Sequence, residues 1–335
     1  MPPAEHRFPH TIVITGAAAG VGRAVAMRFA RTGAKIGAIS RDARALESLA
    51  AELQEAGAYA VAVDALDVSD SDAVQAAAAR FEEELGPIEL WVNDAMLTVF
   101  SPVEAISAAE FRRVTEVTYL GVVHGCMAAL RHMRPRRRGH IINIGSALAY
   151  RGIPLQSAYC GAKHAIRGFT ASLRAEMIHG KSGIAVSIIE LPAMNTPQFD
   201  WARTHMPRQP KPMGTIYQPE AAAEAVFRAA QRKPMEYWVG ASTLWTIVGN
   251  MIMPAFMDWY LARSAVEGQE TAHSVRPDRQ DNLFAPVTAL HRTRGVFDAG
   301  AKPRAVILSG VWTRAAIVTG GALCFFLLGG WLLRI

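Results

Sequence analysis

A serine, a tyrosine and a lysine in the middle of the chain have a spacing that permits acid–base chemistry. Tyr159 and Lys163 are four residues apart in a stretch predicted to be helical, so their side chains share one face. A free tyrosine has a pKa of about 10 and is a poor base at neutral pH, whereas a neighbouring ammonium favours the phenolate. Ser146 follows a predicted strand, where its hydroxyl can bond the oxygen that the phenol serves. The set predicts proton transfer at a substrate oxygen.

The second chemical feature is the segment TGAAAGVG, residues 15–22, whose glycines leave the backbone accessible to a ligand. It follows a β-branched run and precedes apolar residues at helical spacing. Gly16 permits a tight turn, Gly20 lets the backbone approach a ligand, and Gly22 allows a helix to pack closely on a strand. The N–H groups and positive dipole end of that helix then face a phosphate. The turn is a candidate pyrophosphate cradle; a glycine cluster without a ligand is the alternative.

Alternating strands and helices must position these groups. The pattern predicts strands at 11–15, 35–40, 60–65, 90–93, 140–144, 185–190 and 236–239. It predicts helices at 21–31, 44–55, 71–85, 111–130, 158–179 and 220–231. This alternation indicates an α/β fold of the Rossmann type, a doubly wound parallel sheet with helices on both faces.

Taken together, the two motifs resemble the short-chain dehydrogenase/reductase family over residues 8–241. The family's glycine motif, TGxxxGxG, corresponds here to Thr15, Gly16, Gly20 and Gly22. Its catalytic motif, a serine followed thirteen residues later by YxxxK, corresponds to Ser146, Tyr159 and Lys163. The resemblance implies that Tyr159 donates a proton to a carbonyl oxygen as a hydride arrives, or removes it from an alcohol in the reverse reaction.

The resemblance also implies which residues contact the cofactor. Family members that use NAD commonly carry an aspartate at the end of the second strand, but here Ser40 stands there and Arg41 follows. A guanidinium suits a 2′-phosphate, so we expect NADP(H) rather than NAD(H); an Arg41 that merely pairs with Asp42 is the alternative. The implied cofactor-binding residues are Thr15, Gly16, Gly20, Val21, Gly22, Ser40, Arg41, Asp67, Val68, Asn93, Tyr159, Lys163, Pro192 and Thr196.

Two positions depart from the family pattern. Met96 replaces the glycine of the family's NNAG sequence, and a methionine there crowds the cofactor or redirects the loop. Thr118 occupies the position of an asparagine that holds a water of the proton relay. We assign Thr118 as a fourth catalytic residue, although its hydroxyl lacks an amide group. These departures favour the alternative function, a non-catalytic NADP-binding sensor or scaffold.

The chain changes character after residue 241. Residues 242–304 are predicted to be an extension and linker, whose apolar run 244–257 is too short to span a bilayer and predicts a core helix or interfacial segment. Residues 305–335 are predicted to be a membrane anchor, because residues 315–333 carry no charge and would reach about 28 Å as a helix. A packed core or dimer helix is the alternative. Lys302, Arg304 and Arg314 precede the span and only Arg334 follows it, which predicts a cytoplasmic catalytic domain.

The charge, cysteine content and apolar residues of the chain limit the classes of partner and ligand that we expect. The net charge is +6, a weak indication of an anionic partner. The arginine-rich run 131–140 lacks interleaved aromatics, so we expect no nucleic acid; it contacts lipid head groups or is a solvated loop. Three distant cysteines predict neither a disulfide framework nor a metal site. Apolar residues within 195–217 predict a lid over a lipophilic carbonyl or alcohol substrate, and we also expect a homo-oligomer.

Overall fold

The computed structural model describes residues 9–320. Its strands are β1 (Thr11–Thr15), β2 (Lys35–Ser40), β3 (Ala60–Ala65), β4 (Leu90–Asn93), β5 (Val99–Phe100), β6 (Gly139–Ile144), β7 (Ile184–Glu190), β8 (Arg203–Thr204), β9 (Arg208–Pro210), β10 (Glu236–Val239), β11 (Glu270–Ser274) and β12 (Ile307–Ser309). Its labelled α-helices are α1 (Gly20–Ala30), α2 (Ala43–Glu55), α3 (Ser71–Leu85), α4 (Ala108–Thr115), α5 (Gly121–Met133), α6 (Ser157–His179), α7 (Gln198–Trp201), α8 (Pro219–Arg232), α9 (Ala241–Ile252) and α10 (Pro254–Gly268).

An eight-stranded sheet forms the centre of the molecule, in the order β12-β10-β7-β6-β4-β1-β2-β3. Its neighbouring strands are parallel, except that β12 runs antiparallel to β10. The strand order reverses at β1, which pairs with β2 on one side and with β4 on the other. Open α/β sheets bind ligands beyond the carboxyl ends of the strands at such a switch point. The predicted Rossmann-type fold with a mostly parallel sheet is confirmed.

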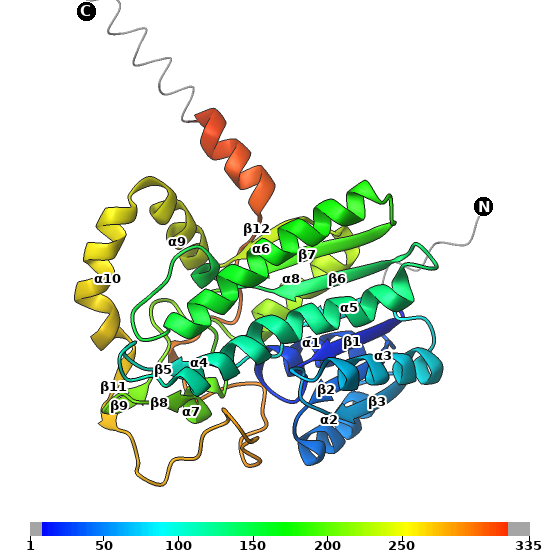
Figure 1. Cartoon of the computed structure of the whole chain (residues 1–335), viewed down its shortest axis with the longest axis horizontal. Helices are drawn as coiled ribbons and strands as arrows, with labels where there is room; N and C mark the ends of the chain where they lie inside the picture. Colours follow the sequence, from blue (N-terminus) through cyan, green and yellow to red (C-terminus); the bar gives the residue numbers. More distant parts are fainter. Residues whose placement is uncertain (1–8, 321–335) are drawn as a thin grey trace, which may run out of the picture.

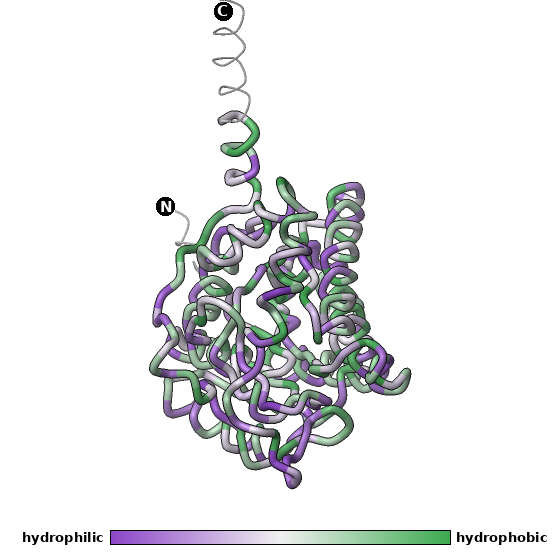
Figure 2. Tube along the Cα trace, turned by 90° about the vertical axis from the view of Figure 1, so that its left-hand side faces the viewer, coloured by the Kyte–Doolittle hydropathy of each residue, from purple (hydrophilic) through white to green (hydrophobic). Residues whose placement is uncertain are grey.

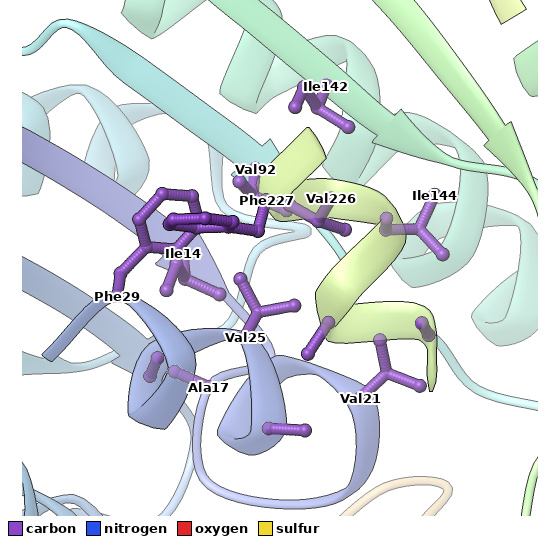
Figure 3. Close-up of a cluster of buried hydrophobic side chains, with 14 of the residues drawn as sticks. Ile14, Ala17, Val21, Val25, Phe29, Val92, Ile142, Ile144, Val226 and Phe227 are labelled. Atoms are coloured by element: carbon purple, nitrogen blue, oxygen red, sulfur yellow. The ribbon is translucent and has the colours of Figure 1, made fainter. Parts of the chain in front are cut away.

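Helices cover both faces of the sheet, each over its own apolar core (Figure 1). On one face, α1, α2 and α8 pack against strand residues such as Ile14 and Ile142 (Figure 3). Phe29 of α1 and Phe227 of α8 meet there with their ring centroids 5.2 Å apart. On the other face, α3, α5 and α6 enclose Trp91 of β4. Burial on both faces explains why the central strands consist almost entirely of apolar residues.

The predicted helix at 111–130 is interrupted. It begins earlier, with α4 at Ala108, because Ser107 and Glu110 form a capping box. A π-helical turn, η1 (Glu116–Leu120), then separates α4 from α5. Such turns are irregularities that often lie at functional sites. This one carries Thr118, so the position assigned to catalysis lies outside regular helical geometry.

The extension also differs from its prediction. The apolar run 244–257 is divided between α9 and α10, because Pro254 has no N–H with which to continue the first helix. Ile307–Ser309, which was assigned to the anchor, instead forms β12 at the edge of the main sheet and pairs with β10. Residues 310–320 follow β12 directly as a helix that projects from the body (Figures 1 and 2).

Between residues 9 and 320, none of the helices combines the length and the apolar character that crossing a membrane requires. The span predicted at 315–333 lies for its greater part outside the described residues. The transmembrane helix therefore stays a prediction.

Candidate active site

A cleft of about 410 Å³ opens at the carboxyl ends of the central strands, beside the switch point between β1 and β4. Residues from both predicted motifs line it. The predicted residues in its wall are Gly16, Gly20, Val21, Ser40, Arg41, Asp67, Val68, Ser146, Tyr159, Lys163, Pro192 and Thr196. The structure thus brings together the glycine turn and the serine–tyrosine–lysine set, which are more than a hundred residues apart in the sequence.

The glycine turn fits a phosphate-binding role because three positions cannot accept a side chain. Gly16 has φ +73° and a Cβ there would lie 2.8 Å from the Cα of Ala95. Gly20, the first residue of α1, has φ +57°. A Cβ on Gly22 would lie 2.4 Å from the carbonyl oxygen of Gly16, so Gly22 permits the close packing that was predicted without lining the cleft. The amino end of α1 therefore lies at the cleft, where a helix start suits a pyrophosphate, and the N–H of Gly20 there donates to a carbonyl oxygen of the chain.

Thr15 supports this turn from below the cleft. Its hydroxyl oxygen accepts hydrogen bonds from the backbone N–H groups of Asp94 and Ala95, at 3.1 and 3.3 Å. The residue is buried and does not line the cleft. Thr15 therefore ties the end of β1 to the loop after β4, which is a supporting role for cofactor binding.

The serine–tyrosine–lysine set is held by β6 and α6. Ser146 follows β6, and its side chain hydrogen-bonds the phenol of Tyr159. The ammonium of Lys163 donates to the carbonyl oxygen of Ile144 at 2.7 Å and lies 5.6 Å from the ring centroid of Tyr159. This places a hydroxyl, a phenol and an ammonium along one wall of the cleft.

The expected depression of the Tyr159 pKa is wrong for this arrangement. Burial raises the pKa of Tyr159, and the hydrogen bond from Ser146 opposes that rise without overcoming it. The ammonium of Lys163 hydrogen-bonds the carbonyl oxygen of Ile144 and interacts with the carboxyl groups of Asp94 and Glu190, rather than with the phenol. The neutral phenol, which is the proton-donating form, is thus the form this site stabilises.

Two buried carboxyl groups that were absent from the predicted site flank Lys163. Burial raises the pKa of Asp94 to about 7, against the opposing charge of Lys163. Burial likewise raises the pKa of Glu190 to about 8, although its Oε2 accepts a 2.6 Å hydrogen bond from the backbone N–H of Ser146. The other oxygen of Glu190 has no hydrogen-bond partner among the described residues, which also favours the protonated acid.

Burial is the largest influence on Lys163 itself. It lowers the pKa of the ammonium to about 8, while the charges of Asp94 and Glu190 raise it. Asp94 stands in the loop after β4, and Glu190 is the last residue of β7. The one sequence signal that could have identified Asp94 as a site residue is its position directly after Asn93. No local sequence signal identifies Glu190, because its role depends on contacts with the neighbouring strand.

Thr118 and Asn93 do not reach the cleft, which corrects two assignments. The hydroxyl of Thr118 both accepts from the N–H of Leu97 and donates to the carbonyl oxygen of Leu97, at 2.9 Å each. The amide of Asn93 is buried, where it donates to Asn143 and accepts from the indole N–H of Trp91. Both side chains hold the backbone that borders the cleft, and neither lines it. Met96, by contrast, does line the cleft.

A C-terminal strap, residues 281–298, completes the cofactor side of the cleft. The N–H of Gly20 donates to the carbonyl oxygen of Arg292 at 3.0 Å, and His291 bonds Asp42 at 2.9 Å. Arg41 donates to the carbonyl oxygens of Asn282 and Leu283. In Figure 1 the strap belongs to the orange connection that follows β11. The segment predicted as a linker thus packs on the very residues predicted to bind the cofactor.

Asp67, at the same corner, is held as a carboxylate. Burial alone would favour the neutral acid, but hydrogen bonds from Arg113 and Ser69 keep the pKa of Asp67 below its usual range. Arg113 also donates to the carbonyl oxygen of Leu283 at 3.1 Å. Arg113 therefore links Asp67, one of the predicted cofactor-binding residues, to the strap.

An apolar wall closes the other side of the cleft. From the predicted lid, Phe199, Trp201 and Met213 line it. Met206 and Tyr217, also expected in the lid, pack in separate apolar clusters instead. The extension adds Thr246, Met257, Tyr260 and Leu261 from α9 and α10.

Open backbone at a helix start and a phenol beside an ammonium define a dinucleotide-dependent oxidoreductase. Residues 10–206 match the family model described as short chain dehydrogenase. The chain belongs to the short-chain dehydrogenase/reductase family and is an NAD(P)-dependent oxidoreductase.

Similar proteins agree with this assignment. The uncharacterized oxidoreductase YxnA of Bacillus subtilis is 30% identical over 282 residues, which are 84% of this chain and 79% of that protein. Levodione reductase of Leifsonia aquatica is 36% identical over 197 residues, 58% of this chain and 73% of that protein. A crystal structure of levodione reductase matches 56% of this chain and 73% of its own, with a TM-score of 0.53 and 33% identity.

A metagenomic short-chain oxidoreductase crystallised with NADP shares the fold, with a TM-score of 0.58 at 24% identity. The match covers 69% of this chain and 97% of that one. All three proteins are oxidoreductases by name.

The pair formed by Asp94 and Lys163 generates a pH prediction. Asp94→Asn removes a carboxylate whose charge raises the pKa of Lys163, so that pKa should fall below about 8. Because an amine loses its charge as the pH rises through its pKa, the decline of kcat/KM at alkaline pH should begin at a lower pH than in the parent enzyme. The measurement is the pH profile of kcat/KM for reduction of a simple ketone.

Asp72→Asn is the control, because Asp72 lies exposed in the first turn of α3. That variant should keep the parent profile. An unshifted alkaline limb in Asp94→Asn would show that Asp94 does not govern the charge of Lys163.

Proposed function

We propose that the protein is an NADPH-dependent reductase of apolar ketones or aldehydes, able to oxidise the matching secondary alcohols in reverse. The observation that carries the proposal is the phenol of Tyr159, which lines the cleft beside Ser146 and opposite an apolar wall. A bound nicotinamide would supply the hydride. Tyr159 donates the proton to the carbonyl oxygen, and Ser146 hydrogen-bonds that oxygen.

The NADP preference rests on Ser40 and Arg41 at the end of β2. No carboxylate stands there to bind ribose hydroxyls, and Arg41 offers two guanidinium nitrogens in a fork. In the structure these donors bond two carbonyl oxygens of the strap, and a 2′-phosphate is a stronger acceptor for the same donors. The NADP complex of the metagenomic enzyme is consistent with this choice.

The apolar character of the substrate rests on the cleft wall. Phe199 of α7, Met213 of the loop after β9 and Leu261 of α10 line the same cleft as Tyr159. A wall of this kind binds a hydrocarbon or ring system, while the few polar groups orient its carbonyl.

Membrane attachment through residues 315–333, with the catalytic domain on the cytoplasmic side, is also proposed. It is supported by the uncharged sequence and by the excess of basic residues before it. A homo-oligomer stays a prediction.

Tyr159→Phe tests the reaction. Loss of the phenolic hydroxyl should lower kcat at least about a hundredfold, because the proton donor is gone, while NADPH affinity stays within about twofold. Turnover is followed by NADPH absorbance with a panel of ketones and aldehydes, and binding by calorimetry.

Tyr59→Phe, an exposed tyrosine, is the control. A Tyr159→Phe enzyme that retains the parent rate would show that the proton has another source. Tight NADPH binding without turnover of any panel member by the parent protein would favour the sensor or scaffold function instead.

Arg41→Ala tests the cofactor preference. Removing a charged donor from a phosphate should weaken NADPH binding about tenfold, whereas NADH, which has no 2′-phosphate, should lose much less. Because the substitution also removes two bonds to the strap, the ratio of the two dissociation constants is the quantity to measure.

Arg44→Ala on α2 should leave that ratio unchanged. A parent enzyme that binds NADH as tightly as NADPH would refute the preference.

Fractionation tests the attachment. The full chain should sediment with membranes and resist carbonate extraction, because a buried helix satisfies its own backbone groups. A chain ending at Gly320, which keeps every described element, should be released. Recovery of the full chain as a monodisperse species without detergent would disprove the span.

A further inference from the structure

The helices α9 and α10 and the turn between them, together the apolar hairpin, expose an unusual set of large side chains. Trp245 is 71% exposed and Ile252 is 65% exposed. The other exposed apolar residues of the hairpin are Met251, Met253, Phe256, Trp259 and Tyr260. Isolated exposed apolar residues are ordinary, but a contiguous group of this kind marks an interaction surface.

The first part of the hairpin carries no charge, and its polar contacts reach the domain. Residues 241–257 contain no charged side chain. Asn250 hydrogen-bonds the domain, donating to the carbonyl oxygen of Tyr150 and accepting from Arg151. Asp258, the first charged residue after this stretch, pairs with the same Arg151. The first charged side chains at the exposed surface of the hairpin are thus those of α10, Asp258 and Arg263.

The composition of this outer face suits a lipid surface. Trp and Tyr concentrate where hydrocarbon meets head groups, because their rings are apolar and one edge is polar. Arg263 lies over the ring of Trp259, with 4.2 Å between its Cζ and the ring centroid, so a cation stands beside the aromatic group. Such a basic residue can meet an anionic head group.

The course of the chain selects the bilayer over a protein partner. The turn of the hairpin lies toward the end of the molecule from which helix 310–320 projects (Figures 1 and 2). Trp312 of that helix is 76% exposed. The uncharged sequence 315–333 begins within the same helix. In Figure 1 the turn of the hairpin and the start of this helix thus lie toward the same end of the molecule, as contact with one flat partner requires.

The hairpin also borders the substrate cleft. Thr243, Thr246, Met257 and Tyr260 line the cleft from the inside. Tyr260 is 44% exposed as well, so it lies at the boundary between the cleft and the outer surface. The hairpin thus has one face in the cleft and another face at the outer surface, where an apolar partner would bind.

We propose that the apolar hairpin lies in the interfacial layer of a lipid bilayer and that the cleft takes its carbonyl substrate from that layer. The substrate class is then a lipid-dissolved carbonyl compound with a long hydrocarbon chain or fused rings. This inference rests on the proposed reductase function and membrane attachment, and it adds a second contact with the membrane, at the entrance of the active site.

A fluorescent label tests the contact in the full chain. A nitrobenzoxadiazole label is placed at Ile252→Cys in a Cys324→Ser background, and the protein is reconstituted into phosphatidylcholine vesicles with a minor fraction of phosphatidylglycerol. The emission should shift to the blue, and it should be quenched by doxyl-labelled phosphatidylcholine and protected from iodide. Val103→Cys is the control, because Val103 is 64% exposed and lies next to β5 and α4, away from the projecting helix (Figure 1).

Two outcomes would overturn the contact. A label at residue 252 that iodide quenches as well as it quenches the label at residue 103 would place the hairpin in water. A label that is shielded equally without vesicles, and loses that shielding on dilution, would show that a second copy of the chain covers the hairpin.

Kinetics test the entrance. Ile252→Glu with Phe256→Glu should lower kcat/KM about tenfold for a long-chain aldehyde dissolved in vesicles, because carboxylates are costly to bury at the acyl boundary and are repelled by anionic head groups. Neither residue lines the cleft, so reduction of a small water-soluble aldehyde should be unchanged. Val103→Glu should alter neither activity. Equal rates for the double variant and the parent on the long-chain aldehyde would refute entry from the bilayer.

The outcomes also separate this inference from the proposed function. Failure of the parent to reduce any aldehyde would refute the reductase, whereas the label reports the membrane contact independently of turnover.

Discussion

The buried ammonium of Lys163 is the constraint on which the active site depends. An ammonium removed from water is costly unless hydrogen bonds and opposite charges compensate for the lost hydration. Here the carbonyl oxygen of Ile144 at the end of β6 accepts a hydrogen bond from the ammonium, and Asp94 in the loop after β4 and Glu190 at the end of β7 raise its pKa in their ionised forms. Three neighbouring parallel segments must therefore end at the same level.

The extension after residue 241 is part of the catalytic unit. Its first half provides one wall of the substrate cleft, and its second half, the strap, bonds Gly20, Arg41 and Asp42 on the cofactor side. The two halves of the extension thus enclose one ligand site together with residues from the first half of the chain. The family model ends at residue 206, so both contributions are features of this chain beyond the matched region.

Much of the fold and site could be predicted because the signals are local. The glycine turn and the tyrosine–lysine pair are each defined within eight residues, and strand and helix periodicities predicted the Rossmann-type sheet. What could not be predicted depends on contacts across the fold. Thr118 matches a family position, but its hydroxyl is consumed by the backbone of Leu97, 21 residues away. The pKa of Tyr159 rises because burial, which no spacing reveals, outweighs the hydrogen bond from Ser146.

The junction between β12 and the helix at 310–320 has a mechanical consequence. No loop residue separates them, and Arg314 in the first turns of that helix forms a 2.7 Å ion pair with Glu236 of β10. The guanidinium also lies over the ring of Trp238, 4.8 Å from its centroid. The helix is therefore held against the sheet by these contacts and is not joined to it by a flexible linker. A partner that binds this helix in one orientation therefore also sets the orientation of the sheet. The mouth of the cleft then faces that partner at one fixed angle.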